Sequence, residues 1–261
     1  MSSNLYDALR STHLFGEHFT LTPVDGGVIN HSFKLQTTEH AFFVKRFQTN
    51  RLTSVDRQAQ YSLQHQLAQH GAAPEPVFLS QRHDVQVEHW VPHSTLAQAN
   101  RSQEDNILAL AQRLAWIHQL PVFALSLDLM ADWEAYLARV EHLNGDWRQQ
   151  MAKLAPVWYD SHGVDQVLCH HDLQFEHVCA DISCVFDWEY AATGNRYFDV
   201  ASCVAINQLT VPQTRTLLNA YADASGIHGD DVARGYQQQA PLVTLTNQLW
   251  FAAADSLRES D

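Results

Sequence analysis

The spacing of hydrophobic residues divides the chain into a first third that predicts strands and a remainder that predicts mostly helices. After a short helix over residues 4–13, apolar and polar residues alternate as they do in half-buried strands. The pattern predicts one polar helix over 53–70, which ends before Gly71, a residue type that often terminates helices. The strands are predicted over residues 19–24, 32–35, 41–47, 77–80 and 85–91.

Helical spacing dominates after Pro92. Apolar residues then recur every three or four positions, first between Ile107 and Ile117. Further helices are predicted over residues 130–143, 147–155, 196–209, 213–223 and 230–257. The sequence therefore predicts an α+β protein of two lobes, with an antiparallel sheet and one helix in residues 1–91 and a mainly helical lobe in residues 92–261.

Two short apolar runs interrupt the helices between Val167 and Phe186, and each predicts a buried strand that ends near a carboxylate. Asp172 follows the first run and Asp187 follows the second. Two carboxylates at strand ends suit a divalent metal ion and a phosphate ester, because one holds the ion while the other takes a proton from a nucleophile. These two residues are the first candidates for chemistry.

Composition narrows the class of partner. A formal net charge of −13 argues against a nucleic-acid partner, which needs a basic face, and is compatible with a cationic substrate. No apolar run approaches the roughly 20 residues of a membrane span, and the first residues do not resemble a signal peptide. Four cysteines in apolar segments, without a CxxC pair, predict reduced core residues in the cytoplasm. The oligomeric state is not predicted.

Short motifs along the chain carry a family resemblance. They are Gly26-Gly27-Val28-Ile29-Asn30-His31, Phe43-Val44-Lys45, Leu114 to Pro121, His170-His171-Asp172-Leu173-Gln174 and Asp187-Trp188-Glu189-Tyr190-Ala191. From Asp25 to about Ala254 the series resembles the aminoglycoside phosphotransferase and choline kinase family, and within it the bacterial thiamine-kinase- and choline-kinase-like members. The resemblance implies a two-lobed protein-kinase-like fold and transfer of the γ-phosphate of ATP to the hydroxyl of a small, cationic alcohol.

The resemblance also implies which residues bind the phosphates of ATP. Gly26 and Gly27 lack a Cβ, so their backbone N–H groups can approach phosphate oxygens closely. Lys45 ends an apolar strand and would reach the α- and β-phosphates. In the resembled family a helix glutamate pairs with this lysine, and Gln60 stands in its place here. We hypothesise that Asp56 or Gln60 holds Lys45.

Glu88, His89 and Trp90 correspond to the hinge between the lobes. The resemblance implies that the backbone of this segment reads the edge of the adenine ring. A plain connector between two lobes would have the same sequence pattern, and the two interpretations are compatible.

The resemblance assigns catalysis and metal binding to the two aspartates at the ends of the predicted strands. Asp172 would accept the proton of the substrate hydroxyl or orient it, and Asp187 would bind Mg²⁺. His177 lies five residues after Asp172, where the resembled family normally has asparagine. Imidazole suits softer ions than Mg²⁺, which predicts weaker Mg²⁺ binding, a preference for Mn²⁺, or loss of turnover. Glu176 offers an oxygen ligand instead, and we hypothesise an active enzyme with one firm metal site at Asp187.

Two further residues are expected to support this loop. His170 would brace it by hydrogen bonding, and Asp199 at a predicted helix start would cap or orient local structure.

A carboxylate and several aromatic residues are candidates for the acceptor site. Glu189, Tyr190 and Trp250 suit a cationic group such as a quaternary ammonium, with Trp188 and Phe251 nearby in sequence. Aromatic core packing is the alternative interpretation for the two tryptophans.

Two other functions remain open from the sequence. Gln60 and His177 motivate a nucleotide-binding pseudokinase with weak or no turnover. A metal phosphohydrolase is the second alternative, because several histidines and acids lie close in sequence, namely His170, His171, Asp172, His177 and Asp187. That alternative leaves Gly26, Gly27 and Lys45 unexplained.

Overall fold

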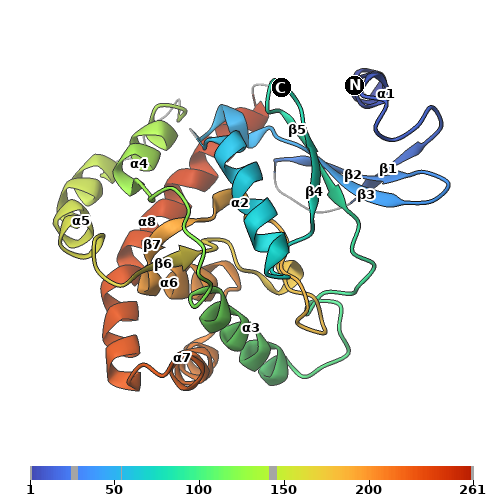
Figure 1. The fold of residues 1–261 in the computed structure, drawn as a ribbon. Coiled ribbons are helices and arrows are strands. Elements are labelled where there is room, and N and C mark those ends of the chain that lie inside the picture. The colour runs from blue at the N-terminus through green and yellow to red at the C-terminus, as the bar shows by residue number, and fades with distance from the viewer. Residues whose placement is uncertain (1, 25–28, 54, 141–145, 260–261) are drawn as a thin grey trace. The chain divides into compact units, whose positions relative to one another are not determined.

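The computed structural model describes residues 2–24, 29–53, 55–140 and 146–259 of the chain (Figure 1). Its elements in chain order are α1 (Ser2–Ser11), β1 (Thr20–Val24), β2 (His31–Gln36), β3 (Ala41–Arg46), η1 (Thr49–Arg51), α2 (Arg57–Gln69), β4 (Pro76–Leu79), β5 (Val85–His89), α3 (Gln103–Ile117), α4 (Leu129–Leu137), α5 (Trp147–Ser161), β6 (Gln166–Cys169), η2 (Phe175–His177), η3 (Trp188–Tyr190), β7 (Ala192–Asn195), α6 (Arg196–Ile206), α7 (Val211–Ser225) and α8 (Gly229–Glu259). None of the helices described is both long enough and apolar enough to cross a membrane.

The chain divides into two compact units. The first contains Met1–Arg51 and Pro74–Pro92, and the second contains Leu52–Ala73 and His93–Asp261. The predicted α+β class is confirmed, with an antiparallel sheet near the N-terminus and a mainly helical remainder.

The first unit is a five-stranded antiparallel sheet in the order β1-β2-β3-β5-β4, accompanied by α1. Alternation of side chains along β3 buries Phe42 and Val44 and directs Phe43 and Lys45 to the opposite face. The buried residues pack with Leu5 and Leu9 of α1 in one apolar core. The opposite face therefore remains available for polar chemistry.

The second unit surrounds a short antiparallel pair, β6 and β7, with helices. Apolar residues of α3, α6 and α7 share its core with Leu168 and Leu173, which flank the segment before Asp172. The long helix α8 packs along α4, α5, α6 and α7 (Figure 1). The loop after β6 is thus anchored on both sides by buried residues.

Helix α2 starts later than the sequence predicts, and it belongs to the second unit rather than to the first. It begins at Arg57 rather than at residue 53, because the Asp56 carboxylate accepts the N–H of Ala59 at 3.0 Å and caps the helix. Sequence analysis assigned this helix to residues 1–91, whereas Leu63 and Leu67 pack in the core of the second unit.

The strands around the acidic motifs also differ from the prediction. The run that ends at Phe186 forms only an isolated bridge between Val178 and Val185, rather than a regular strand. The partner of β6 is β7, which the sequence analysis did not predict, because Ala-Thr-Gly-Asn lacks the apolar alternation of a strand.

A tight contact between α8 and α6 gives a stability prediction. A Cβ at Gly235 would lie 2.3 Å from Cγ of Tyr197. Gly235→Ala is therefore expected to destabilise the protein by about 1–3 kcal/mol, although alanine normally favours a helix. Gly229→Ala on the same helix, where a Cβ would meet no atom within 4 Å, is the matched control. The measurement is the urea midpoint, and equal midpoints for the two variants would contradict the prediction.

Candidate active site

The loop that carries Asp172 is held by one buried carboxylate. Strand β6 ends at Cys169, and the next two backbone N–H groups donate to Asp199. His170 N–H lies 2.8 Å from Oδ2 of Asp199, and His171 N–H lies 2.7 Å from its Oδ1. Because Asp199 is completely buried in the first turns of α6, these bonds fix the direction in which the chain leaves β6.

His118 and Tyr221 complete this buried network. Nε2 of His118 lies 3.1 Å from Oδ2 of Asp199, and its Nδ1 lies 2.7 Å from the hydroxyl of Tyr221. A carboxylate only accepts, so Nε2 carries the proton and Nδ1 accepts from the hydroxyl. Burial lowers the pKa of His118. Burial, the largest single effect, would raise the pKa of Asp199, but the hydrogen bond from His118 and the neighbouring histidines together outweigh it, and that pKa falls to about 2.

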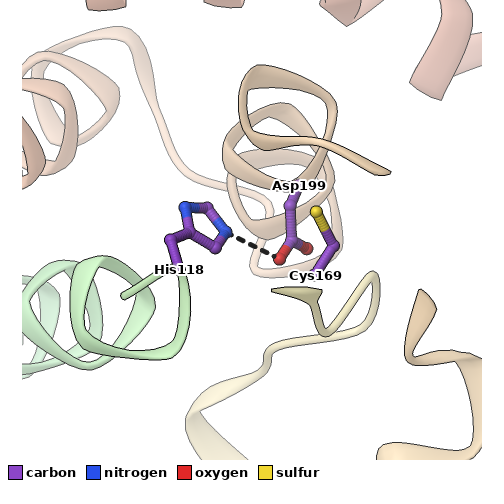
Figure 2. Close-up of side chains that lie close together, drawn as sticks. All are labelled: His118, Cys169 and Asp199. Carbon is purple, nitrogen blue, oxygen red and sulfur yellow. Dashed lines mark hydrogen bonds and ion pairs between the residues drawn. The ribbon is translucent and has the colours of Figure 1, made fainter. Parts of the chain in front are cut away.

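Figure 2 shows three buried side chains that point toward one another, those of His118, Cys169 and Asp199. Each offers one potential metal-ligand atom, and these atoms lie within 4.8 Å of one another. Among the described residues this is the group that meets the spacing of a metal site. Asp199 already accepts from three donors. Burial raises the pKa of Cys169, so its sulfur keeps its proton. The group therefore positions the loop and does not resemble a centre that holds an ion.

His170 braces the same loop from the inside. Its Nε2 donates to the carbonyl oxygen of Phe186 at 2.9 Å, and its Nδ1 accepts the N–H of Asp172 at 3.3 Å. Burial lowers the pKa of His170 to about 4, so the ring is neutral. The histidine thereby ties the segment of Asp172 to the segment that precedes Asp187.

Two residues of the site have a left-handed backbone. His171 has a φ of 65° and Asp187 a φ of 60°. Such conformations cost non-glycine residues about 1 kcal/mol or more and persist where other contacts enforce them. For His171 the contacts are the bonds to Asp199 and a bond from its Nδ1 to the carbonyl of Tyr190 at 3.0 Å.

His177 lies between the carboxylates of Asp172 and Asp187. Its Nδ1 is 3.8 Å from Oδ2 of Asp172, and its Nε2 is 3.7 Å from Oδ2 of Asp187. Asp172 also accepts from Nε2 of Gln174 at 2.9 Å. Burial raises the pKa of Asp172 to about 6, although the charge of His177 opposes this shift. The two predicted acidic residues thus meet around one imidazole.

The tautomer of His177 follows from its backbone contact. Nδ1 lies 2.7 Å from the carbonyl oxygen of Asp172, which only accepts, so Nδ1 carries a proton. In the neutral ring Nε2 then presents a lone pair toward Asp187. A nitrogen and a carboxylate oxygen facing each other at 3.7 Å fit two ligands of one divalent ion, whose bonds measure about 2.0–2.2 Å.

The residues predicted to contact the acceptor lie beside this centre. Nε1 of Trp250 donates to the hydroxyl of Tyr190 at 3.2 Å. Glu189 is largely buried and lies 3.6 Å from Nη1 of Arg57 on α2. Burial raises the pKa of Tyr190, and the charges of Glu189 and Asp172 add to that shift. Tyr190 therefore faces both the acidic side chains and the aromatic ring of Trp250.

Apart from Gln60 on α2, the residues predicted to bind the nucleotide lie in the first unit. Gly26 and Gly27 fall outside the described residues. The register places Lys45 opposite Ser32 and Gln86, and Phe43 opposite Lys34 and Glu88. These side chains share the face of the sheet that is not used by the core.

Two backbone N–H groups of the predicted hinge already donate hydrogen bonds to other backbone carbonyl groups. The N–H of His89 donates to the carbonyl of Glu75 at 3.0 Å, and the N–H of Trp90 donates to the carbonyl of Ala41 at 3.1 Å. The ammonium group of Lys34 lies over the ring of Trp90, with Nζ 4.8 Å from the ring centroid. An adenine edge would therefore be read by other backbone groups of this segment.

Both residues proposed to hold Lys45 have partners within the second unit. Asp56 caps α2, as described above, and Nε2 of Gln60 donates to the carbonyl of Ala191 at 2.8 Å. The other amide atom of Gln60, Oε1, is buried and has no hydrogen-bond partner among the described residues. That Asp56 or Gln60 holds Lys45 stays a prediction.

A family model decides the classification. The model of the phosphotransferase enzyme family matches residues 20–240, which is most of the chain. The chain belongs to this family. The predicted resemblance and the prediction of a phosphotransferase are thereby confirmed. No curated protein sequence matches the chain.

Solved structures share the fold of this phosphotransferase at low sequence identity. Choline kinase LicA from Streptococcus pneumoniae is 18% identical, with a TM-score of 0.75 over 99% of this chain and 92% of that one. An ethanolamine kinase from Plasmodium vivax is 13% identical, with a TM-score of 0.74 over 98% and 83%. An aminoglycoside-3'-phosphotransferase of type VIII is 19% identical, with a TM-score of 0.66 over 90% and 98%.

Two residues beside the candidate acceptor residues were missed by the sequence analysis. Asp132 and Tyr136 lie one turn apart on α4, and the pKa of Tyr136 is raised by burial and by the charges of Asp132 and Glu189. Burial raises the pKa of Asp132 to about 6. The available signal was their spacing of four positions on one helix face, which places an acid beside a phenol.

Proposed function

We propose that this phosphotransferase transfers the γ-phosphate of ATP to a hydroxyl group of a small cationic alcohol. The observation that carries the proposal is the approach of Asp172 and Asp187 to opposite nitrogens of His177, at 3.8 and 3.7 Å. This arrangement brings a base, Asp172, and a metal ligand, Asp187, to opposite sides of one imidazole ring. The choline kinase LicA, which has a similar fold, was also solved in complex with AMP, which supports a nucleotide as the donor.

Asp172 acts on the acceptor hydroxyl in this proposal. Its raised pKa makes it a better base than an exposed aspartate, and Gln174 and the loop contacts fix its direction. Phosphoryl transfer requires little covalent help from a protein, so orientation of the hydroxyl supplies most of the effect. Gly26, Gly27 and Lys45 are proposed to bind the phosphates.

Asp187 and Nε2 of His177 are proposed to hold the divalent ion. When bound, the ion neutralises charge on the β- and γ-phosphates. The carboxylate suits Mg²⁺, whereas the imidazole nitrogen favours a softer ion such as Mn²⁺. His177 is held for this role by its bond to the carbonyl of Asp172.

Tyr190 and Trp250 are proposed to contact the acceptor, and Glu189 contributes negative potential. A cation over aromatic faces gains about 0.5–2 kcal/mol, and neighbouring carboxylates add attraction. Asp132 and Tyr136 extend the acidic and aromatic character of this region. A hydroxyl compound with an ammonium or quaternary ammonium group fits this chemistry.

A screen for ADP release tests the proposal. Choline, ethanolamine, thiamine, aminoglycosides, homoserine and neutral sugars are compared in the presence of ATP with Mg²⁺ or Mn²⁺. We expect release with one or more cationic alcohols that disappears in Asp172→Asn. Release with neutral sugars alone would overturn the cationic acceptor, and no release with any alcohol would overturn the transferase reaction.

A pseudokinase is the second candidate, and the position of His177 favours it. The imidazole of His177 lies between the two carboxylates at a position where the resembled family normally has an asparagine. Thermal-shift titration with ATP and metal separates the candidates, because stabilisation by ATP without turnover would favour the pseudokinase.

The phosphohydrolase receives less support from the geometry. It requires free ring nitrogens on His170 and His171, yet His170 uses both of its nitrogens and His171 uses Nδ1 in bonds to the backbone. These histidines brace the loop and are not arranged around an ion.

The substitution His177→Asn gives a prediction on metal preference. An amide oxygen is a harder ligand than an imidazole nitrogen, so we expect Mg²⁺ affinity to rise and Mn²⁺ affinity to fall, each by about tenfold. Electron paramagnetic resonance of Mn²⁺, with Mg²⁺ as competitor, measures both affinities without turnover. We expect phosphoryl transfer with Mg²⁺ to rise in parallel.

His228→Asn, at an exposed histidine, is the matched control and should change neither affinity. An unchanged ratio of Mn²⁺ to Mg²⁺ affinity in His177→Asn would exclude the nitrogen as a ligand.

A further inference from the structure

Two side chains of α2 hold the backbone on either side of Tyr190. Nη1 of Arg57 donates to the carbonyl oxygen of Glu189 at 3.4 Å, and Nε2 of Gln60 donates to the carbonyl oxygen of Ala191 at 2.8 Å. Glu189 lies in the 3-10 helix η3, and Ala191 is its C-terminal cap. Because the backbone hydrogen bonds of a 3-10 turn have poor geometry, contacts from outside contribute much of the order of such a turn.

Arg57 binds Glu189 at two places. Besides the carbonyl oxygen, its Nη1 lies 3.6 Å from Oε2 of the Glu189 carboxylate. The side chains are only 3% and 10% exposed. A buried charge is costly without its partner, so this ion pair restricts the conformations that Glu189 can adopt.

The contact made by Gln60 depends on its amide group. Gln60 stands at the position where the resembled family has a glutamate. An ionised glutamate only accepts hydrogen bonds, so it could not donate to the carbonyl oxygen of Ala191. The bond to η3 therefore requires the residue in which this chain departs from the family pattern.

His171 connects the same turn to the segment of Asp172. Its Nδ1 donates to the carbonyl oxygen of Tyr190 at 3.0 Å, and Asp172 follows it directly in the chain. At the other end of Tyr190, the hydroxyl accepts from Nε1 of Trp250 at 3.2 Å. Tyr190 is thus held both at its backbone and at its ring, beside the segment of the proposed base.

We propose that Gln60 and Arg57 are positioning residues for the acceptor alcohol. They do not touch the acceptor themselves. Their bonds to η3 keep the ring of Tyr190 and the carboxylate of Glu189 in the orientation that receives the cationic group. The inference rests on the proposed function, because it explains how the residues assigned there to the acceptor are held in place.

Substitution of Gln60 tests the role of its donor. Gln60→Glu keeps the shape of the side chain and removes its N–H groups, and Gln60→Met removes them without adding charge. The KM is measured for choline, or for the alcohol of the screen above that releases ADP fastest. We expect the KM for the alcohol to rise about tenfold in both variants, while the KM for ATP changes less than about twofold.

Gln66→Glu makes the same chemical change at an exposed position of α2 and is the matched control, which should alter neither constant. An unchanged KM for the alcohol in both Gln60 variants would overturn the proposal. A rise in the KM for ATP alone would also overturn it, because Gln60 would then serve the nucleotide. A rise confined to Gln60→Glu would assign the effect to the added charge and exclude the donor.

Arg57 allows a rescue experiment. Arg57→Met should raise the KM for the alcohol at least about tenfold, because the Glu189 carboxylate loses this buried cation. Arg57→Lys keeps a cation and a donor and should restore most of the affinity. Equal effects of the two substitutions would overturn the role of this ion pair.

Hydrogen exchange separates failure of this inference from failure of the proposed function. Amide exchange in peptides that cover residues 188–193 should become about tenfold faster in Gln60→Glu, with exchange in α7 unchanged. This measurement requires no turnover. Faster exchange in a chain that phosphorylates no alcohol would support the contact between α2 and η3 and contradict the transferase reaction. Unchanged exchange would overturn the inference, whatever the turnover.

Discussion

Asp172→Asn is expected to reduce phosphoryl transfer by about a hundred- to ten-thousandfold, which is the usual contribution of a positioned general base. Asparagine keeps the size of the side chain and an oxygen for the bond from Gln174, but it cannot take a proton. The affinity for nucleotide, measured by thermal shift, should change little. Asp160→Asn on the exposed side of α5 is the matched control.

The pH dependence provides an independent check on this role. Burial raises the pKa of Asp172 to about 6, and the base is active only when ionised. Turnover of the wild-type protein should therefore fall as pH decreases through about 6, and the residual turnover of Asp172→Asn should lack that limb. A wild-type rate that is flat between pH 7 and about 5 would exclude Asp172 as the base.

Asp199→Ala is expected to destabilise the protein by about 3–5 kcal/mol, because it leaves buried donors without an acceptor. The donors are the N–H groups of His170 and His171 and Nε2 of His118. Asp199→Asn, which retains one oxygen acceptor, should cost less. Urea midpoints measure both effects.

Asp230→Ala, at an exposed aspartate, is the control for loss of a carboxylate in this region of the chain. A cost below about 1 kcal/mol for Asp199→Ala would show that the loop does not depend on this carboxylate. Because the loop carries Asp172, the rate constant for transfer should also fall in Asp199→Asn at temperatures where that variant is folded.

The acidic motifs could be located from sequence because their pattern is local. An apolar run followed by Asp172, and a second before Asp187, places both residues at the ends of buried segments. The strands of the antiparallel sheet were predictable for the same reason. Apolar and polar residues alternate along 41–47 because successive side chains of a strand point to opposite faces of the sheet. Both inferences use neighbours within a few positions.

The supporting contacts could not be predicted because they join distant positions. His118 lies 81 residues from Asp199 and 103 residues from Tyr221. No pattern along the chain links such residues before the helices are packed. Helix α2 shows the same limit, because the apolar face of Leu63 and Leu67 indicates burial but not which core covers it.

The placement of α2 has a consequence for synthesis on the ribosome. Helix α2 contacts η3, its Leu63 and Leu67 share a core with Trp188, and the carbonyl of Ala72 just after the helix accepts the N–H of Val185. Translation makes the helix well before these partners, so its apolar side is exposed while more than a hundred further residues are added. The nascent chain therefore exposes an apolar segment for a long interval, during which it is vulnerable to aggregation and offers a binding segment to chaperones.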